Sequence, residues 1–254
     1  MRLLGFAPQC YYSFYLYALN NLDEVRDELI KVIENSLGLR VYPPEELRIV
    51  LVSVPIRRSP TAIVRGGYDP ITKTIFLSDR TWCRKTFIHE LLHAVSYFSR
   101  VPELFGVFNR EYEFVEGLTE FLTGYVLYSR YSNCYAEWIS KRYLVCSISY
   151  ERYVRLFGAL AHMLIPISDL IKLFVYDPNI DWFDEYNRFL NRYGLEDFLI
   201  NKPKKKRKIP LETLLEDMVV KVLREKVGEE KVEQFRELRY EAPLDVVLDY
   251  SNMM

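Results

Sequence analysis

Residues 89–93 read His-Glu-Leu-Leu-His, a pattern whose residue types and spacing are suited to binding a metal ion. On a helix, side chains four positions apart lie one above the other, so the imidazoles of His89 and His93 can reach one ion. Glu90 then lies at the edge of the same site, where it can take a proton from a water molecule that the metal activates. We therefore predict that His89 and His93 are metal ligands and that Glu90 is the catalytic base.

A pattern of five residues also arises by chance, so its surroundings matter. The neighbouring residues are apolar and would bury the other faces of a helix: Phe87, Ile88, Leu91, Leu92 and Val95. The alternative is that two histidines share a helix face by accident. The chain has only three histidines, which favours the metal site over this accident.

A third ligand is expected downstream, because catalytic zinc sites use three protein ligands and keep one position open for water. Glu116 and Glu120 lie four residues apart in an otherwise apolar and aromatic stretch. Burying two carboxylates is costly unless a cation or a hydrogen-bond donor accompanies them, and a metal ion with a bound histidine would supply both. The alternative is a solvated helix face that also carries Glu113.

With these residues the sequence resembles the gluzincin metallopeptidases, the clan that includes thermolysin, and in layout it is most similar to the archaeal minigluzincins. The resemblance covers about residues 45–130. It implies that Zn2+ is bound by His89, His93 and Glu116, that Glu90 is base and proton shuttle, and that the reaction is hydrolysis of a peptide bond. It also implies that Glu120 orients a ligand histidine. The substrate would be a peptide or protein.

His162 is the remaining histidine, and two roles are open for it. It can be a core histidine with a hydrogen-bonded partner such as Asp169. It can also be a catalytic residue that donates a hydrogen bond to the tetrahedral oxyanion, a role that His or Tyr plays in gluzincins. Twenty tyrosines compete for that role.

Hydrophobic periodicity, β-branched runs and the positions of Gly and Pro predict the elements that must position these residues. Strands are expected over 47–54, 61–68 and 74–78. Helices are expected over 21–37, 81–98, 109–129, 136–143, 150–165, 168–176, 181–193, 210–227 and 229–240.

These elements predict an α+β fold with a zincin-like mixed sheet and an active-site helix. Residues 1–200 would form the catalytic domain, with an upper lobe over about 1–99 and a helical lower lobe over about 100–200. Residues 201–254 would form a basic linker and a helical C-terminal region. Within that region, residues 242–248 are expected to be extended, so they could pair with the strand edge near residues 62–64 and restrict substrate entry. The alternative is that the region packs as a plain structural part or mediates dimerisation.

Composition narrows the functional classes. The 254-residue chain has a formal net charge of −1, which gives no overall attraction to nucleic acid or to a membrane surface. No stretch is predicted to span a membrane and no signal pattern is seen at the N-terminus, so we expect a cytoplasmic protein. The sequence predicts no oligomeric state.

Two further functions stay open beside peptide hydrolysis. One is a catalytically idle or latent zinc-binding interaction protein. The other is a nucleic-acid-associated module recruited by the basic run at residues 202–208, although such runs are more often solvated linkers.

The four cysteines form no CxxC pair, so a cysteine-based zinc site is not expected and buried free thiols are favoured. The scarcity of glutamine, with two in the chain, is typical of thermophiles, whose intracellular proteins do contain disulfides. A bridge between Cys134 and Cys146 is therefore the alternative.

Overall fold

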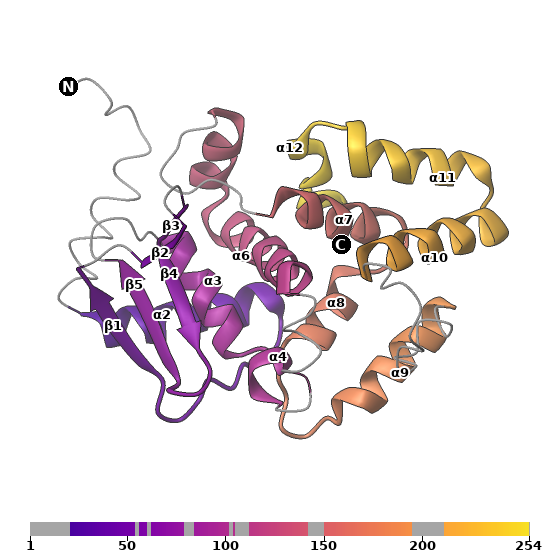
Figure 1. Cartoon of the computed structure of the whole chain (residues 1–254). Helices are drawn as coiled ribbons and strands as arrows, with labels where there is room; N and C mark the ends of the chain where they lie inside the picture. Colours follow the sequence, from indigo (N-terminus) through magenta and orange to yellow (C-terminus); the bar gives the residue numbers. More distant parts are fainter. Residues whose placement is uncertain are drawn as a thin grey trace. The chain divides into compact units, whose positions relative to one another are not determined.

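A computed structural model of the chain describes residues 21–53, 56–59, 62–78, 84–101, 104, 112–141, 150–194 and 211–253 (Figure 1). These residues form a mixed α/β structure that is mostly helical and contains a small mixed sheet. The chain divides into two compact units. The first comprises Met1–Arg100 and Leu122–Ile148, and the second comprises Val101–Phe121 and Ser149–Met254. In the described parts of the chain, no helix is long and apolar enough to cross a membrane.

The first unit begins with helix α2 (Leu22–Leu37). Its buried stripe includes Val25, Leu29 and Ile33, at the spacing of one helix face. Gly38 ends the helix with φ of 69°, a left-handed conformation that glycine adopts without steric cost. The predicted helix over 21–37 is thus confirmed.

The sheet of the first unit has three strands in the order β1-β5-β4. Strand β1 (Arg48–Val52) runs parallel to the central strand β5 (Thr74–Ser78), and β4 (Gly66–Asp69) runs antiparallel to it. Strand β5 is the most buried of the three, as expected for the centre of a sheet. Strand β4 therefore lies at an edge.

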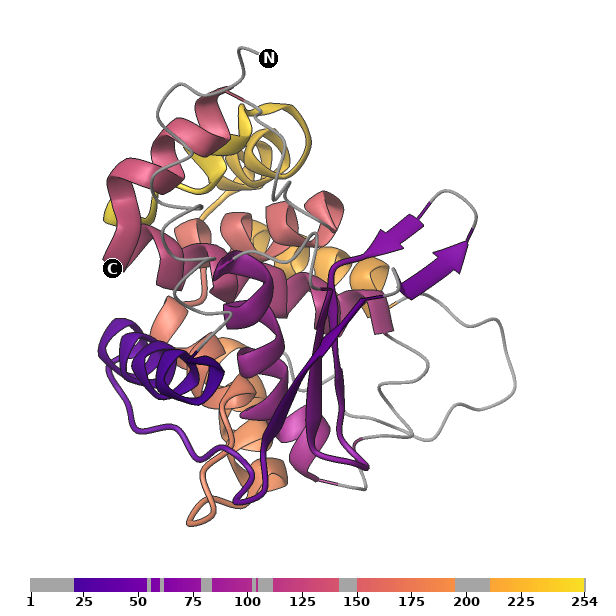
Figure 2. The same ribbon diagram turned by 90° about the vertical axis from the view of Figure 1, so that its left-hand side faces the viewer.

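The single strand predicted over 61–68 is wrong in one respect, because the chain changes partner at Arg65. Residues before it form β3 (Ala62–Val64), which pairs antiparallel with β2 (Ile56–Ser59), a strand that was not predicted. This ribbon extends beyond the three-stranded sheet (Figure 2). Composition indicates which residues are extended, but not which neighbour each one pairs with.

Helix α3 (Arg84–Ala94) carries the His-Glu-Leu-Leu-His pattern and lies between the sheet and α2 (Figure 2). The single helix predicted over 81–98 is divided into α3 and the short α4 (Tyr97–Arg100). The division follows from the His93 carbonyl, which accepts hydrogen bonds from Ser96 N at 3.1 Å and from Ser96 Oγ at 2.8 Å. The Ser99 hydroxyl donates to the same carbonyl. Helix α3 therefore ends directly after its second histidine.

Helix α6 (Tyr112–Lys141) replaces the two helices predicted over 109–129 and 136–143. Residues 125–141 contain neither Gly nor Pro, so nothing local interrupts the helix. Its N-terminal part belongs to the second unit and its remainder to the first. The helix is continuous through both.

The second unit is helical, and its predicted helices are confirmed within a few residues at their ends. It contains α7 (Glu151–Met163), α8 (Ile167–Phe174), α9 (Trp182–Tyr193), α10 (Leu211–Lys226), α11 (Glu229–Arg236), a π-helix η2 (Glu237–Glu241), α12 (Leu244–Val247) and a 3-10 helix η3 (Tyr250–Asn252).

The extended segment predicted over 242–248 is wrong, because α12 lies within it. Pro243 directly precedes this helix with φ of −54°, a value that proline fixes and that suits a helix start. The segment packs on α7, where a Cβ added at Gly158 would lie 2.6 Å from Val247 Cγ1. The C-terminal region is therefore a packed part of the second unit.

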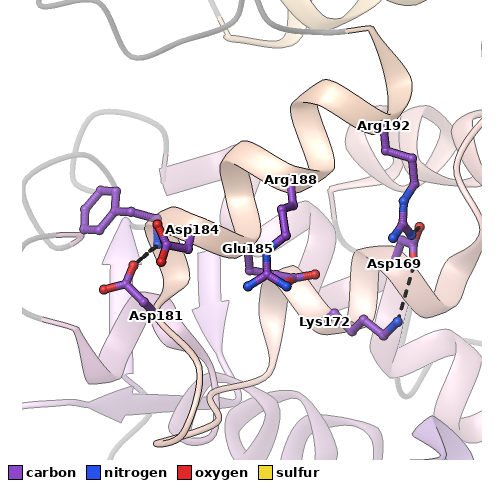
Figure 3. A network of polar contacts seen from close by, with 8 residues as sticks. Asp169, Lys172, Asp181, Asp184, Glu185, Arg188 and Arg192 are labelled. Atoms are coloured by element: carbon purple, nitrogen blue, oxygen red, sulfur yellow. Dashed lines mark hydrogen bonds and ion pairs between the residues drawn. The ribbon is translucent and has the colours of Figure 1, made fainter.

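A polar clamp joins α8 to α9 (Figure 3). The buried carboxylate of Asp169 accepts hydrogen bonds from Arg192 Nη1 at 2.6 Å and from the Tyr193 hydroxyl, and Lys172 Nζ lies 3.7 Å away. Burial would raise the pKa of Asp169, but these hydrogen bonds and positive charges outweigh it and hold the pKa below its usual range.

Candidate metal centre

His89 and His93 lie one turn apart on α3, with their Nε2 atoms 3.1 Å apart. The rings meet edge to face, with centroids 4.8 Å apart and planes at 73°. Two nitrogen ligands of a tetrahedral zinc ion, each about 2.0–2.1 Å from the metal, are about 3.3–3.4 Å apart. The observed separation is close to that value, so the pair fits a single ion.

Glu116 completes the group. The ligand atoms of His89, His93 and Glu116 all lie within 4.8 Å of one another. Glu116 is 7% exposed and His89 is 9% exposed, so these two donors are largely withdrawn from water, whereas His93 is half-buried. Two imidazole nitrogens and one carboxylate form a donor set that transition metals such as zinc prefer. The three residues predicted as ligands are thus together, and they could hold a metal ion.

Helix α6 presents a buried polar stripe that contains Glu116. Thr119, Glu120 and Thr123 follow it at helical spacing, and each is at most 4% exposed. The Thr119 hydroxyl donates to Val115 O at 2.8 Å, within the same helix. Because burying two carboxylates is expensive unless they are paired or coordinate a metal, this stripe supports the metal site. The alternative of a solvated helix face is wrong for Glu116 and Glu120, because both are buried. That Glu120 orients a ligand histidine stays a prediction.

Thr123 is a residue of the site that sequence reasoning missed. Its Oγ1 lies 3.5 Å from His89 Nδ1, the ring nitrogen on the side opposite the second histidine. An acceptor at this position favours the tautomer that leaves Nε2 free for a metal. The signal was present in the sequence, since Thr123 comes seven residues after Glu116 and so lies on the same helix face.

Glu90 is 7% exposed and lies on α3 against strand β4. A Cβ added at Gly66 would lie 3.2 Å from Glu90 Cγ, so the strand backbone approaches the stem of this side chain closely. The predicted base is thus held between its own helix and the sheet edge. No local sequence pattern had singled out Gly66.

The edge strand β4 offers backbone groups for pairing. Arg65 O accepts a hydrogen bond from Ser78 N at 2.8 Å. Two and four residues further along, Gly67 faces Phe76 and Asp69 faces Thr74 of β5. In an antiparallel pair, alternate residues point their N–H and C=O groups toward the partner, so those of Gly66 and Tyr68 point away from β5. Burial raises the pKa of the Tyr68 hydroxyl to about 12, against the opposing effect of the Arg100 charge.

His162 lies in the last turn of α7, in the second unit. Its Nε2 is buried and has no hydrogen-bond partner among the residues that the structure describes. Asp169, the partner considered for it, instead binds Arg192 and Tyr193. The oxyanion role of His162 stays a prediction.

Two expectations lie outside the described residues and side chains. These are the bridge between Cys134 and Cys146 and the basic linker at residues 202–208.

Comparisons of the chain with protein-family models, with curated proteins and with solved structures find no match. Any functional proposal for this chain therefore rests on the geometry of the group formed by His89, His93 and Glu116.

Proposed function

We propose that this protein is a zinc-dependent peptidase of the gluzincin type. The observation that carries the proposal is the group of His89, His93 and Glu116, with Glu90 next to the first ligand on α3. Among the residues that the structure describes, the group offers two imidazoles and one glutamate, and three such ligands with a fourth position open to water are the arrangement of catalytic zinc sites.

The chain's own residues have distinct roles in this proposal. His89, His93 and Glu116 would hold the ion, and Thr123 would orient the ring of His89. A zinc ion in this place supplies a Lewis acid that polarises a carbonyl group and makes water nucleophilic near neutral pH. Glu90 takes the proton of the attacking water and passes it to the nitrogen of the leaving amine. The donor to the oxyanion that the sequence predicts is His162, and this role is kept as part of the proposal.

The edge strand supports a peptide as the substrate. The backbone N–H and C=O groups of Gly66 and Tyr68 point away from β5, and an extended peptide can pair with such groups as an additional strand. Gly66 also lies against Glu90, so a peptide paired here would pass close to the base.

A zincin-like fold is part of the proposal. It is supported by a small mixed sheet whose antiparallel strand lies at the edge, and by the packing of α3 against strands β4 and β5.

The test is hydrolysis of a mixture of unstructured peptides by the zinc-loaded full-length protein, followed by mass spectrometry. We expect cleavage by the unaltered protein. Glu90→Gln should lower the rate by at least about a hundredfold with its zinc content unchanged, because the base is lost and the ligands remain. Release of zinc by Glu90→Gln, or the absence of any cleavage by the unaltered protein, would refute the assignment.

A further inference from the structure

Gly66 and Gly67 are adjacent in strand β4 but have different surroundings. A Cβ added at Gly66 would lie 2.7 Å from Thr86 Cγ2 and 3.2 Å from both Glu90 Cγ and Phe76 O. A Cβ added at Gly67 would have no atom within 4 Å. Successive residues of a strand face opposite sides, and α3 packs on the side of Gly66.

Backbone conformation does not explain the glycine at position 66. Neither residue has a positive φ, so alanine could adopt the backbone of both. The requirement for glycine at position 66 is therefore steric. It comes from two α3 side chains, those of Thr86 and Glu90, and from the backbone oxygen of Phe76 on β5. One of these side chains is the proposed catalytic base.

We propose that Gly66 is a positioning residue for Glu90, an inference that rests on the proposed peptidase function. The missing side chain lets the β4 backbone lie in contact with the Glu90 stem. This contact limits the directions that the carboxylate can take and keeps it beside the backbone groups of the strand edge. A larger residue would push the Glu90 side chain aside while leaving His89 and His93 in place, because the two side chains nearest to the added Cβ are those of Thr86 and Glu90, and its third close neighbour is the backbone oxygen of Phe76.

The experiment compares Gly66→Ala with Gly67→Ala, which adds the same methyl group to open space. A double variant, Gly66→Ala with Thr86→Ser, removes the shortest contact and leaves Glu90 as the close side-chain neighbour. It also keeps the test usable if the single variant folds poorly. Thr86→Ser alone is the control for the double variant. Three quantities are measured for each protein: the position of the Glu90 side chain in a crystal structure, zinc affinity by competition with a chelating dye, and kcat with KM on a cleaved peptide.

We expect both proteins that carry Gly66→Ala to bind zinc within about twofold of the unaltered affinity, with the Glu90 carboxylate displaced. We expect kcat to fall by about tenfold or more with KM nearly unchanged, because small displacements of a reacting group have effects of this size. Gly67→Ala and Thr86→Ser should behave like the unaltered protein.

An unmoved Glu90 side chain in the Gly66→Ala and double-variant structures would overturn the inference. An equal loss of kcat in Gly67→Ala would also overturn it. If the unaltered protein cleaves no peptide, the proposed function fails, and the crystal structures still decide whether Gly66 positions Glu90.

Discussion

A histidine that binds a metal through Nε2 works best when its other ring nitrogen is held by a hydrogen-bond acceptor. In this protein the Thr123 hydroxyl lies 3.5 Å from His89 Nδ1 and can accept such a bond. This contact joins helix α6 to His89, the first of the two histidines on α3. The proposed metal centre would thus depend on a residue beyond the three that could hold the ion.

This contact predicts a difference between two buried threonines of α6. Thr123→Val keeps the shape of the side chain but removes the acceptor, so zinc affinity should fall about tenfold. Thr119→Val is the matched control, because its hydroxyl donates to Val115 O within its own helix. Affinity is measured by competition with a chelating dye. Equal affinities of the two variants would show that Thr123 does not tune the site.

At the level of single residues, the sequence predicted the features that depend on one-dimensional spacing. His89 and His93 are identifiable because four residues make one helix turn, and Glu116 because a carboxylate in an apolar helix needs a cation. Gly66 could not be found in this way. Its importance comes from the distance between a strand and a helix, which no local pattern contains.

The α8–α9 clamp shows how a buried carboxylate fixes two elements. Asp169 holds Arg192 and Tyr193 of the next helix, and its pKa lies below the usual range because those partners outweigh its burial. A carboxyl group with a lowered pKa in the folded state stabilises that state at pH above its usual value of about 4. The contribution disappears as the pH falls through the lowered pKa.

We therefore expect Asp169→Asn to lower the free energy of unfolding by about 1–3 kcal/mol at pH 7. The difference from the unaltered protein should shrink as the pH falls from about 4 through the lowered pKa of Asp169, because protonation removes the charge that its partners stabilise. Urea unfolding at several pH values measures both effects. Asp217→Asn, which alters an exposed carboxylate on α10, should change stability far less. A pH-independent difference would contradict the assigned role of the charge.

Element boundaries were predictable where a local signal ends the element. Gly38 and Gly194 both end helices in the left-handed conformation, and both helix ends were predicted. The split between α3 and α4 was not predicted, because it comes from serine side chains that bond to the His93 carbonyl. The exchange of strand partners at Arg65 was likewise not predicted, because it depends on tertiary structure and not on a local signal.

On the scale of the whole molecule, the C-terminal region belongs to the second unit. Arg239 is 2% exposed and bonds to Glu216 and to the carbonyl of Arg152 on α7. Tyr250 is fully buried, and its hydroxyl donates to Phe121 O at 3.3 Å. These contacts favour the alternative in which this region is a structural part over the one in which it obstructs the site.

Truncation after Asn201 tests that choice. It would remove several fully buried apolar side chains, and burying each one stabilises the fold by about 1.5–3 kcal/mol. The net free energy of unfolding of a protein is only about 5–15 kcal/mol, so a loss of this kind is large. We expect the melting temperature to fall by about 10 °C or more, with peptide hydrolysis lowered. Calorimetry and the peptide assay measure the two effects. A truncated protein with an unchanged melting temperature and faster hydrolysis would instead support autoinhibition.

The division of the chain into units could not be predicted from the order of its elements. The second unit takes in residues 101–121, and the chain then returns to the first unit along the same helix, α6. The change of unit falls between Phe121 and Leu122, inside the helix predicted over 109–129, so a correctly predicted helix does not reveal it.

The most direct test of the central claim is the zinc content of the purified full-length protein after loading and dialysis. The metal centre predicts close to one zinc ion per chain. Glu116→Ala should lower zinc affinity by at least about a hundredfold, because a ligand is lost. Glu113→Ala, which removes an exposed carboxylate one turn earlier on α6, should bind zinc as the unaltered protein does. A protein without bound zinc, or a Glu116→Ala variant that holds zinc as tightly as Glu113→Ala, would contradict the assignment.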